Sequence, residues 1–204
     1  MPLEPKRACF DTTVLWGAFH SPGGPNFKLL ELAAQRVPVL DGFITDAVGA
    51  EFWWRATQQG VKGPRDSVAR TYTAEELAPF FDAFDVLLEP DTMPRAPLGR
   101  TLGRYAGLVG LSLGEVLYTI TGKDRDALLT GATTAFRVTF ESMDIADLHV
   151  IAGAIDNGAE ELITNDGTTL GHDPIGSLRV RTAVSLAGEL GLIDMSAAPT
   201  SVRS

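Results

Sequence analysis

Four carboxylates that follow apolar runs or lie near helix starts are the residues of this sequence best suited to chemistry. Asp11 and Asp166 each come directly after a short apolar run, whereas Glu51 and Asp147 lie in the first two turns of expected helices. Carboxylate oxygens are the hard ligands that suit divalent ions such as Mg²⁺ or Mn²⁺. Such an ion neutralises the charge of a phosphate and activates a water molecule. This combination is the chemistry of phosphodiester hydrolysis.

Each acid also has an ordinary structural interpretation. Asp11 could cap a following helix, and Asp147 could be a first-turn charge at the positive end of a helix dipole. Asp166 could belong to the turn-favouring tripeptide 165–167, and Glu51 could lie on a solvated helix face. Their joint occurrence with a helix rich in small residues and with Thr164 favours a shared metal site over four unrelated roles.

The segments that must position these acids alternate between strands and helices. Short apolar runs predict buried strands at 8–10, 43–45, 85–88, 161–164 and 178–181. Helical spacing and terminal residues predict helices at 26–36, 47–59, 145–157 and 183–190, and a capping box at Thr73 and Glu76 begins another. The alternation predicts an α/β fold with a central, mostly parallel sheet, whose ligands bind beyond the carboxyl ends of the strands.

The segment 90–140 departs from this alternation. Its candidate helices, at 98–109, 112–121 and 124–136, make it a helical insertion. We expect one domain over residues 1–194, because 204 residues are few for two independent cores. Residues 195–204 are expected to form a flexible tail.

The composition is typical of a globular protein, with 45% hydrophobic and 21% charged residues. No segment predicts a signal peptide or a membrane span. The single cysteine, Cys9, lies in an apolar run, so it is expected to be buried and excludes an internal disulfide. These features predict a cytoplasmic protein.

A net charge of −9 is unusual for a protein that binds nucleic acid, but the acids are unevenly spread. Residues 55–137 contain ten Lys or Arg and ten Asp or Glu, which leaves seven bases and sixteen acids for the rest of the chain. If the neutral segment flanks an acidic pocket, the segment could bind phosphates while the pocket binds metal.

The histidines and tryptophans have weaker implications. His20 and His172 are expected in loops, and His149 could touch a phosphate, although a surface or packing role is favoured. Trp53 and Trp54 are adjacent on a helix and cannot face the same way, so one of them could be exposed.

Three separated segments resemble the signature of PIN-domain ribonucleases, the fold of VapC-type bacterial toxins. Residues 10–15 contain a strand-ending Asp followed by small polar residues, and residues 44–52 place Glu51 on the helix after the second strand. Residues 144–166 contain a helix-opening Asp, a small-residue helix and a strand that ends in Thr-x-Asp. The chain departs from the family at Thr13, where many members have Asn or Ser, and in being longer than the compact toxins.

The resemblance implies a three-layer α/β/α PIN-like fold in which Asp11, Glu51, Asp147 and Asp166 bind Mg²⁺ or Mn²⁺. Thr13 and Thr164 would support this site. The implied activity is an endoribonuclease that uses in-line attack by water and leaves 5′-phosphate and 3′-hydroxyl ends. RNA is the implied substrate, and an antitoxin protein and a second copy of the chain are further candidate partners.

The insertion is expected to contribute substrate contacts, because it carries the densest basic cluster of the chain. Arg100 and Arg104 are its central members, beside Arg95, Lys123 and Arg125. Replacing Arg100 and Arg104 by Ala should weaken RNA binding and flatten its salt dependence, since fewer counterions would be released.

Two other functions compete with the nuclease. A catalytically silent PIN scaffold could bind RNA or a protein partner, but it would have no need of all four acids. A small Mg²⁺-dependent phosphatase would need a covalent nucleophile in an Asp-x-Asp arrangement, which the first strand lacks.

Overall fold

The computed structural model of the chain describes residues 5–63, 66–89, 108–128 and 143–194. Within these ranges five parallel strands form one sheet in the order β3-β2-β1-β4-β5. The strands are β1 (Lys6–Phe10), β2 (Leu40–Thr45), β3 (Leu88–Glu89), β4 (Glu161–Ile163) and β5 (Arg179–Arg181). The predicted α/β class and parallel sheet are therefore confirmed.

The carboxyl-terminal part of the central strand β1 is buried. Ala8, Cys9 and Phe10 of β1 are fully buried, as continuous apolar runs are in parallel sheets that are covered on both faces. Cys9 pairs with Phe43 in register, and Phe10 pairs with Ile163. This register brings the carboxyl end of β1 beside that of β4.

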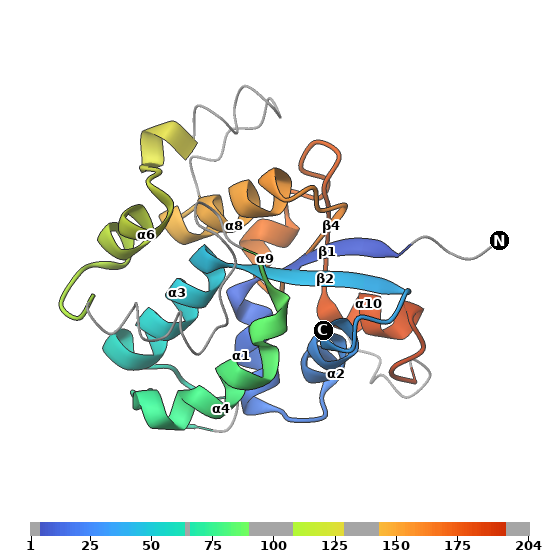
Figure 1. Cartoon of the computed structure of the whole chain (residues 1–204), viewed down its shortest axis with the longest axis horizontal. Helices are drawn as coiled ribbons and strands as arrows, with labels where there is room; N and C mark the ends of the chain where they lie inside the picture. The colour runs from blue at the N-terminus through green and yellow to red at the C-terminus, as the bar shows by residue number, and fades with distance from the viewer. Residues whose placement is uncertain (1–4, 64–65, 90–107, 129–142, 195–204) are drawn as a thin grey trace, which may run out of the picture.

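Helices lie on both sides of the sheet, which is compatible with a three-layer α/β/α arrangement. In Figure 1, α8 (Ile145–Asp156) lies above the strands, whereas α2 (Pro25–Ala34), α4 (Ala74–Phe84) and α10 (Ala183–Glu189) lie below them. α1 (Thr12–His20) follows β1 and packs against α2. The helix after Thr73 has the predicted capping box with Glu76.

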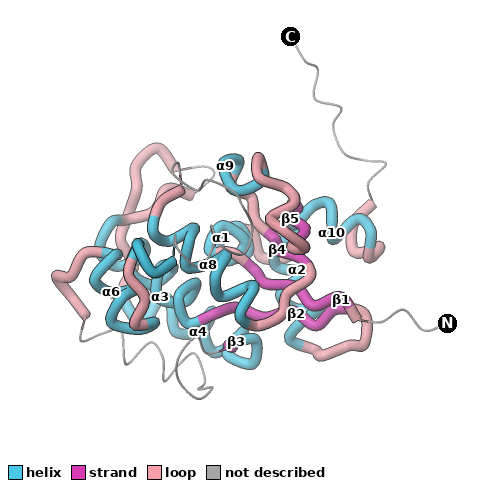
Figure 2. Tube along the Cα trace, turned by 90° about the horizontal axis from the view of Figure 1, so that it is seen from above, coloured by secondary structure: helices cyan, strands magenta, loops and turns pink. Residues whose placement is uncertain are grey.

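Three helices gather at one end of the molecule, as both Figure 1 and Figure 2 show. They are α3 (Asp46–Trp54), α6 (Leu113–Thr121) and α8, and each packs against the other two. Val116 and Leu117 of α6 are fully buried, and Trp54 donates its indole N–H to the carbonyl of Leu111 at 2.8 Å. This part of the predicted insertion therefore contributes to the hydrophobic core.

Other expectations for the insertion and tail lie largely outside the described residues. These include most of the helices expected at 98–109 and 124–136, the side chains of Arg100 and Arg104, and residues 195–204. The helix expected at 112–121 is confirmed as α6, with Ser112 as its cap.

Several local expectations need correction. Residues 85–88 do not form a strand throughout, because η2 (Asp85–Leu87) is a 3-10 turn and β3 begins only at Leu88. Residues 167–170, for which the sequence predicted no element, form the short helix α9 (Gly167–Leu170). His20 is the last residue of α1 rather than a loop residue, and its ring stacks on Trp16 with 5.7 Å between centroids.

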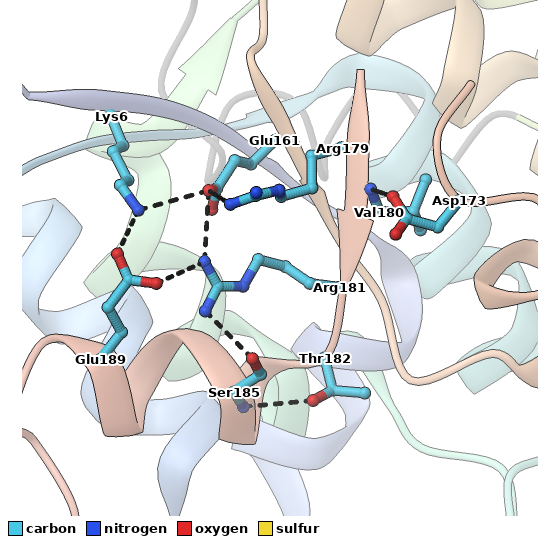
Figure 3. Close-up of polar contacts among 9 residues, drawn as sticks. All are labelled: Lys6, Glu161, Asp173, Arg179, Val180, Arg181, Thr182, Ser185 and Glu189. Carbon is cyan, nitrogen blue, oxygen red and sulfur yellow. Dashed lines mark hydrogen bonds and ion pairs between the residues drawn. The ribbon is translucent and has the colours of Figure 1, made fainter. Parts of the chain in front are cut away.

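An ion-pair network surrounds Glu161 and joins three strands to α10 (Figure 3). The Glu161 carboxylate lies 3.3 Å from Arg181, 3.5 Å from Lys6 and 3.9 Å from Arg179. Glu189 of α10 pairs with Arg181 at 2.8 Å and also with Lys6. None of these five residues lines the cavity that contains the predicted acids.

None of the helices within the described ranges is long and apolar enough to cross a membrane.

Candidate functional site

A cavity of about 530 Å³ brings the four predicted acids together. Asp11 caps α1 after β1, and Asp166 caps α9 after β4. Glu51 comes from α3, and Asp147 lies in the first turn of α8. The cavity therefore lies beyond the carboxyl ends of neighbouring parallel strands, where α/β sheets bind ligands.

Asp11 lines the cavity and accepts three hydrogen bonds. Its Oδ1 accepts from the backbone N–H of Thr12 at 2.6 Å, and its Oδ2 accepts from the hydroxyls of Thr13 and Thr164 at 2.7 Å each. Burial raises the pKa of the Asp11 carboxyl, and these hydrogen bonds lower it in part. The capping role and a place in the site coincide in this residue.

Two threonine hydroxyls also fix the loop that carries Asp166. The N–H of Asn165 donates to Thr13 Oγ1 at 2.9 Å, and the N–H of Asp166 donates to Thr164 Oγ1 at 2.9 Å. Asp166 itself accepts from the N–H of Thr169 at 2.7 Å. Thr13 and Thr164 thus connect the segments after β1 and β4.

Glu51 is buried, so its interpretation as a solvated helix residue is wrong. Its Oε2 accepts from the hydroxyl of Thr12 at 2.5 Å, and its Oε1 accepts from Arg55 Nε at 2.6 Å. Burial, and next the charge of Asp11, raise the pKa of the Glu51 carboxyl, whereas Arg55 and Thr12 oppose that rise. Both Glu51 oxygens therefore already have protein donors.

Asp147 is the least compensated acid of the site. Burial is the main cause that raises its pKa to about 7, followed by the charges of Asp144, Asp11, Asp166 and Glu51. Within the described residues the Asp147 side chain forms no ion pair. Asp144 caps α8 by accepting from the backbone N–H of Asp147 at 2.9 Å, which brings a fifth carboxylate to the cavity.

The four acids share a cavity, but their side chains are not arranged as a preformed metal-binding site. In the ranges that the structure describes, no group of three or more His, Cys, Asp or Glu side chains is arranged to hold an ion. The reason is physical: Asp11 and Glu51 turn their oxygens toward protein donors, and carboxylates repel one another without a cation between them.

The donor types nevertheless fit a hard divalent ion. The described residues that line the cavity offer carboxylate and hydroxyl oxygens, and they include no histidine or cysteine. Such oxygen donors suit Mg²⁺ or Mn²⁺ better than the softer metals.

Several lining residues were not predicted as site residues. Arg55 lies four residues after Glu51 and Asp144 lies three before Asp147, so helical spacing could have indicated both. Arg55 also pairs with Asp144 at 3.6 Å. Lys62 lines the same cavity beyond the end of the helix, where no periodic pattern could have placed it.

The burial of His149, Trp53 and Trp54 decides between the roles that the sequence left open for them. His149 is buried between α6 and α8 with only 2% exposure, and its Nδ1 lies 3.4 Å from Thr121 Oγ1, so it has a packing role and does not line the cavity. Trp53 is buried and Trp54 is half-buried under the segment before α6, so neither is exposed.

No protein-family model, curated protein or solved structure matches this chain.

Proposed function

We propose that this protein is a Mg²⁺- or Mn²⁺-dependent nuclease that hydrolyses phosphodiester bonds in RNA. The observation that carries the proposal is the meeting of Asp11, Glu51, Asp147 and Asp166, from four separate segments, in one cavity. Burying acids and gathering like charges are both unfavourable, and burial first and the neighbouring carboxylates next raise the pKa of Asp147. Strongly perturbed acids in a cleft are typical of functional sites.

The finer assignment is a PIN-type endoribonuclease. It is supported by the motifs of the sequence, by the parallel sheet, and by the positions of Asp11 and Asp166 after β1 and β4. The choice of RNA over DNA rests on the family resemblance alone. A toxin role, an antitoxin partner and a homodimer rest on it in the same way.

In this proposal the four acids would hold the ion. When bound, Mg²⁺ or Mn²⁺ would neutralise charge on the phosphate and make an attacking water more nucleophilic. Thr13 and Thr164 orient Asp11, and Thr12 orients Glu51, through the hydrogen bonds described above. A cation would stabilise the Asp147 carboxylate most, because burial and then four neighbouring carboxylates disfavour its charged form.

One observation favours a second candidate, a silent scaffold that binds RNA without cutting it. Both oxygens of Glu51 are satisfied by Thr12 and Arg55, as a protein that holds no ion would require. In such a scaffold Arg55 would serve as the permanent counter-ion of the cavity.

Cleavage of end-labelled single-stranded RNA separates the two candidates. The wild type should cut RNA with Mg²⁺ or Mn²⁺ and stop when EDTA is added, and Asp147→Asn should not cut. Asp82→Asn, on the exposed side of α4, is the control that removes one carboxylate elsewhere. A wild type that leaves RNA and DNA intact with both metals would eliminate the nuclease and leave the scaffold.

A further inference from the structure

Two groups of residues of opposite charge line the cavity, and they are called its acidic wall and its basic wall here. Asp11, Glu51, Asp144, Asp147 and Asp166 form the acidic wall, and the other wall contains Arg55, Gln59, Gly60, Val61 and Lys62. A polyanionic substrate is repelled by the first wall and attracted by the second. Its backbone should therefore reach the acids by way of the basic wall.

The backbone before Lys62 is constrained by secondary structure and by hydrogen bonds. α3 continues into η1 (Arg55–Gln59), a π-helical turn of the kind that often marks functional sites. Gly60, with φ of 80°, then redirects the chain, in a backbone conformation that favours glycine. Val61 pairs with Arg70 through two backbone hydrogen bonds, at 2.9 and 3.0 Å.

The residue after Lys62 is equally constrained. The N–H of Gly63 donates to Asp66 Oδ2 at 3.1 Å. A Cβ atom at Gly63 would lie 2.5 Å from that oxygen and 3.1 Å from His20 Nδ1, so the chain packs closely against the end of α1. Lys62 therefore lies in a segment whose backbone is constrained on both sides of it. This segment, residues 59–63, is called the ledge here.

The two cations of the basic wall differ in how far their charge is already compensated. Arg55 pairs with Glu51 at 2.6 Å and with Asp144 at 3.6 Å. Lys62 is exposed and forms no ion pair with any residue in the described part of the chain. A compact ammonium group of this kind binds phosphate as a point charge.

We infer that Lys62 binds a backbone phosphate of single-stranded RNA and so directs the strand across the ledge toward the acidic wall. The identity of the substrate rests on the proposed function. Because a contact with a backbone phosphate carries no sequence information, it should contribute equally to RNAs of different sequence. It would make Lys62 a positioning residue for the substrate rather than a residue that takes part in bond cleavage.

Fluorescence anisotropy with labelled oligo(A) and oligo(U) tests this inference. Binding is measured over a series of NaCl concentrations with Ca²⁺ in place of Mg²⁺, and a gel verifies that the RNA stays intact. Lys62→Gln should bind both RNAs about five- to tenfold more weakly, and the slope of log Kd against log[NaCl] should fall by about 0.7. Lys62→Arg should retain the wild-type affinity and slope.

Arg179→Gln is the charge-matched control. Arg179 is 64% exposed in its side chain, and it lies outside the cavity at the start of β5. It should leave both affinity and slope unchanged, whereas equal losses in Lys62→Gln and Arg179→Gln would reduce the effect to net charge and overturn the inference.

The remaining outcomes separate this inference from the proposed function. Unchanged binding by Lys62→Gln would overturn the phosphate contact even if the wild type cleaves RNA. A specific loss in Lys62→Gln from a wild type that never cleaves RNA would retain the contact and reject the nuclease. A loss confined to one of the two RNAs would contradict a phosphate contact, and a wild type that binds neither RNA would reject both proposals.

Discussion

Asp147 carries the uncompensated negative charge of the site. Its pKa of about 7 in the folded protein lies above the value of 3.8 for a free Asp, with burial as the main cause. Between these two values the folded state binds more protons than the unfolded state, so the stability that this group contributes decreases as the pH rises from about 4 to about 7. Near neutral pH the carboxylate therefore destabilises the metal-free protein.

Asp147→Asn should consequently leave the metal-free protein as stable or more stable at pH 7. The gain should be about 1 kcal/mol, because solvent reaches this half-buried group and screens the repulsion. The same change should abolish the rise in Tm that Mg²⁺ or Mn²⁺ gives the wild type, since that rise requires binding to the folded state. Thermal melts with and without metal measure both effects.

Asp82→Asn serves as the control for these melts. A markedly less stable Asp147→Asn protein in EDTA would identify Asp147 as a structural residue of α8. A metal-induced rise in Tm that persists in this variant would remove Asp147 from the site.

His149 gives a second pH dependence of stability, with the opposite sign. Burial is the main cause that lowers its pKa from 6.5 to about 4, and Lys123 adds to the effect. The unfolded chain therefore binds the proton first, and stability should fall by about 1–3 kcal/mol as the pH decreases from about 7 to about 4. His149→Gln should flatten this part of the stability profile.

Urea unfolding at a series of pH values measures the slope. His172→Gln, in the turn after α9, is the matched histidine substitution for comparison. An unchanged slope in His149→Gln would show that this histidine titrates alike in the folded and unfolded states.

At the scale of elements, the network around Glu161 should contribute to stability independently of the site. Glu161 is buried at the start of β4, and three cations from β1 and β5 surround it. Glu161→Gln should destabilise the protein by about 2 kcal/mol, because Arg181 would lose a buried counter-ion but keep Glu189.

The exposed neighbour Glu160 provides the comparison. Glu160→Gln should change the free energy of unfolding by less than about 0.5 kcal/mol. Equal stability of Glu161→Gln and the wild type in urea unfolding would mean that the cost of burying the Glu161 charge offsets its ion pairs.

The sequence predicted most of the elements because burial and local caps leave clear patterns. The run 8–10 and the helix after Asp144 are apolar at the expected spacing, and both are present as β1 and α8. The sequence indicated α1 only as the helix that Asp11 could cap, without indicating its range. The turn η2 was not predicted, because Leu87 in the turn and Leu88 in the strand are both buried and apolar. An apolar run therefore does not distinguish the turn from the strand.

The predicted acids of the site were brought together because parallel strands end at one edge of the sheet. Asp11 and Asp166 follow strands that pair directly, and Glu51 and Asp147 lie on the helices α3 and α8, which pack together. The position of Lys62 in the same cavity could not be predicted in this way. Lys62 reaches the cavity through the turn at Gly60 and the pairing of Val61 with Arg70, which are tertiary features.

At the scale of the whole molecule, the uneven distribution of charge corresponds to the division of the cavity. Arg55 and Lys62 belong to the electrically neutral segment 55–137, whereas all five acids of the cavity lie outside that segment, in the parts of the chain that carry the excess of acids. A net charge of −9 is therefore compatible with a local basic path to an acidic centre.

The binding of Mn²⁺ tests most directly whether the four acids form one metal site. Titration calorimetry of the wild type should give a saturable site, and Asp11→Asn, Glu51→Gln, Asp147→Asn and Asp166→Asn should each weaken it, whereas Asp82→Asn should not. Melting curves in EDTA verify that each variant is folded. A wild type that binds no Mn²⁺, or four variants that bind it as tightly as the wild type, would contradict the metal site and with it the proposed nuclease.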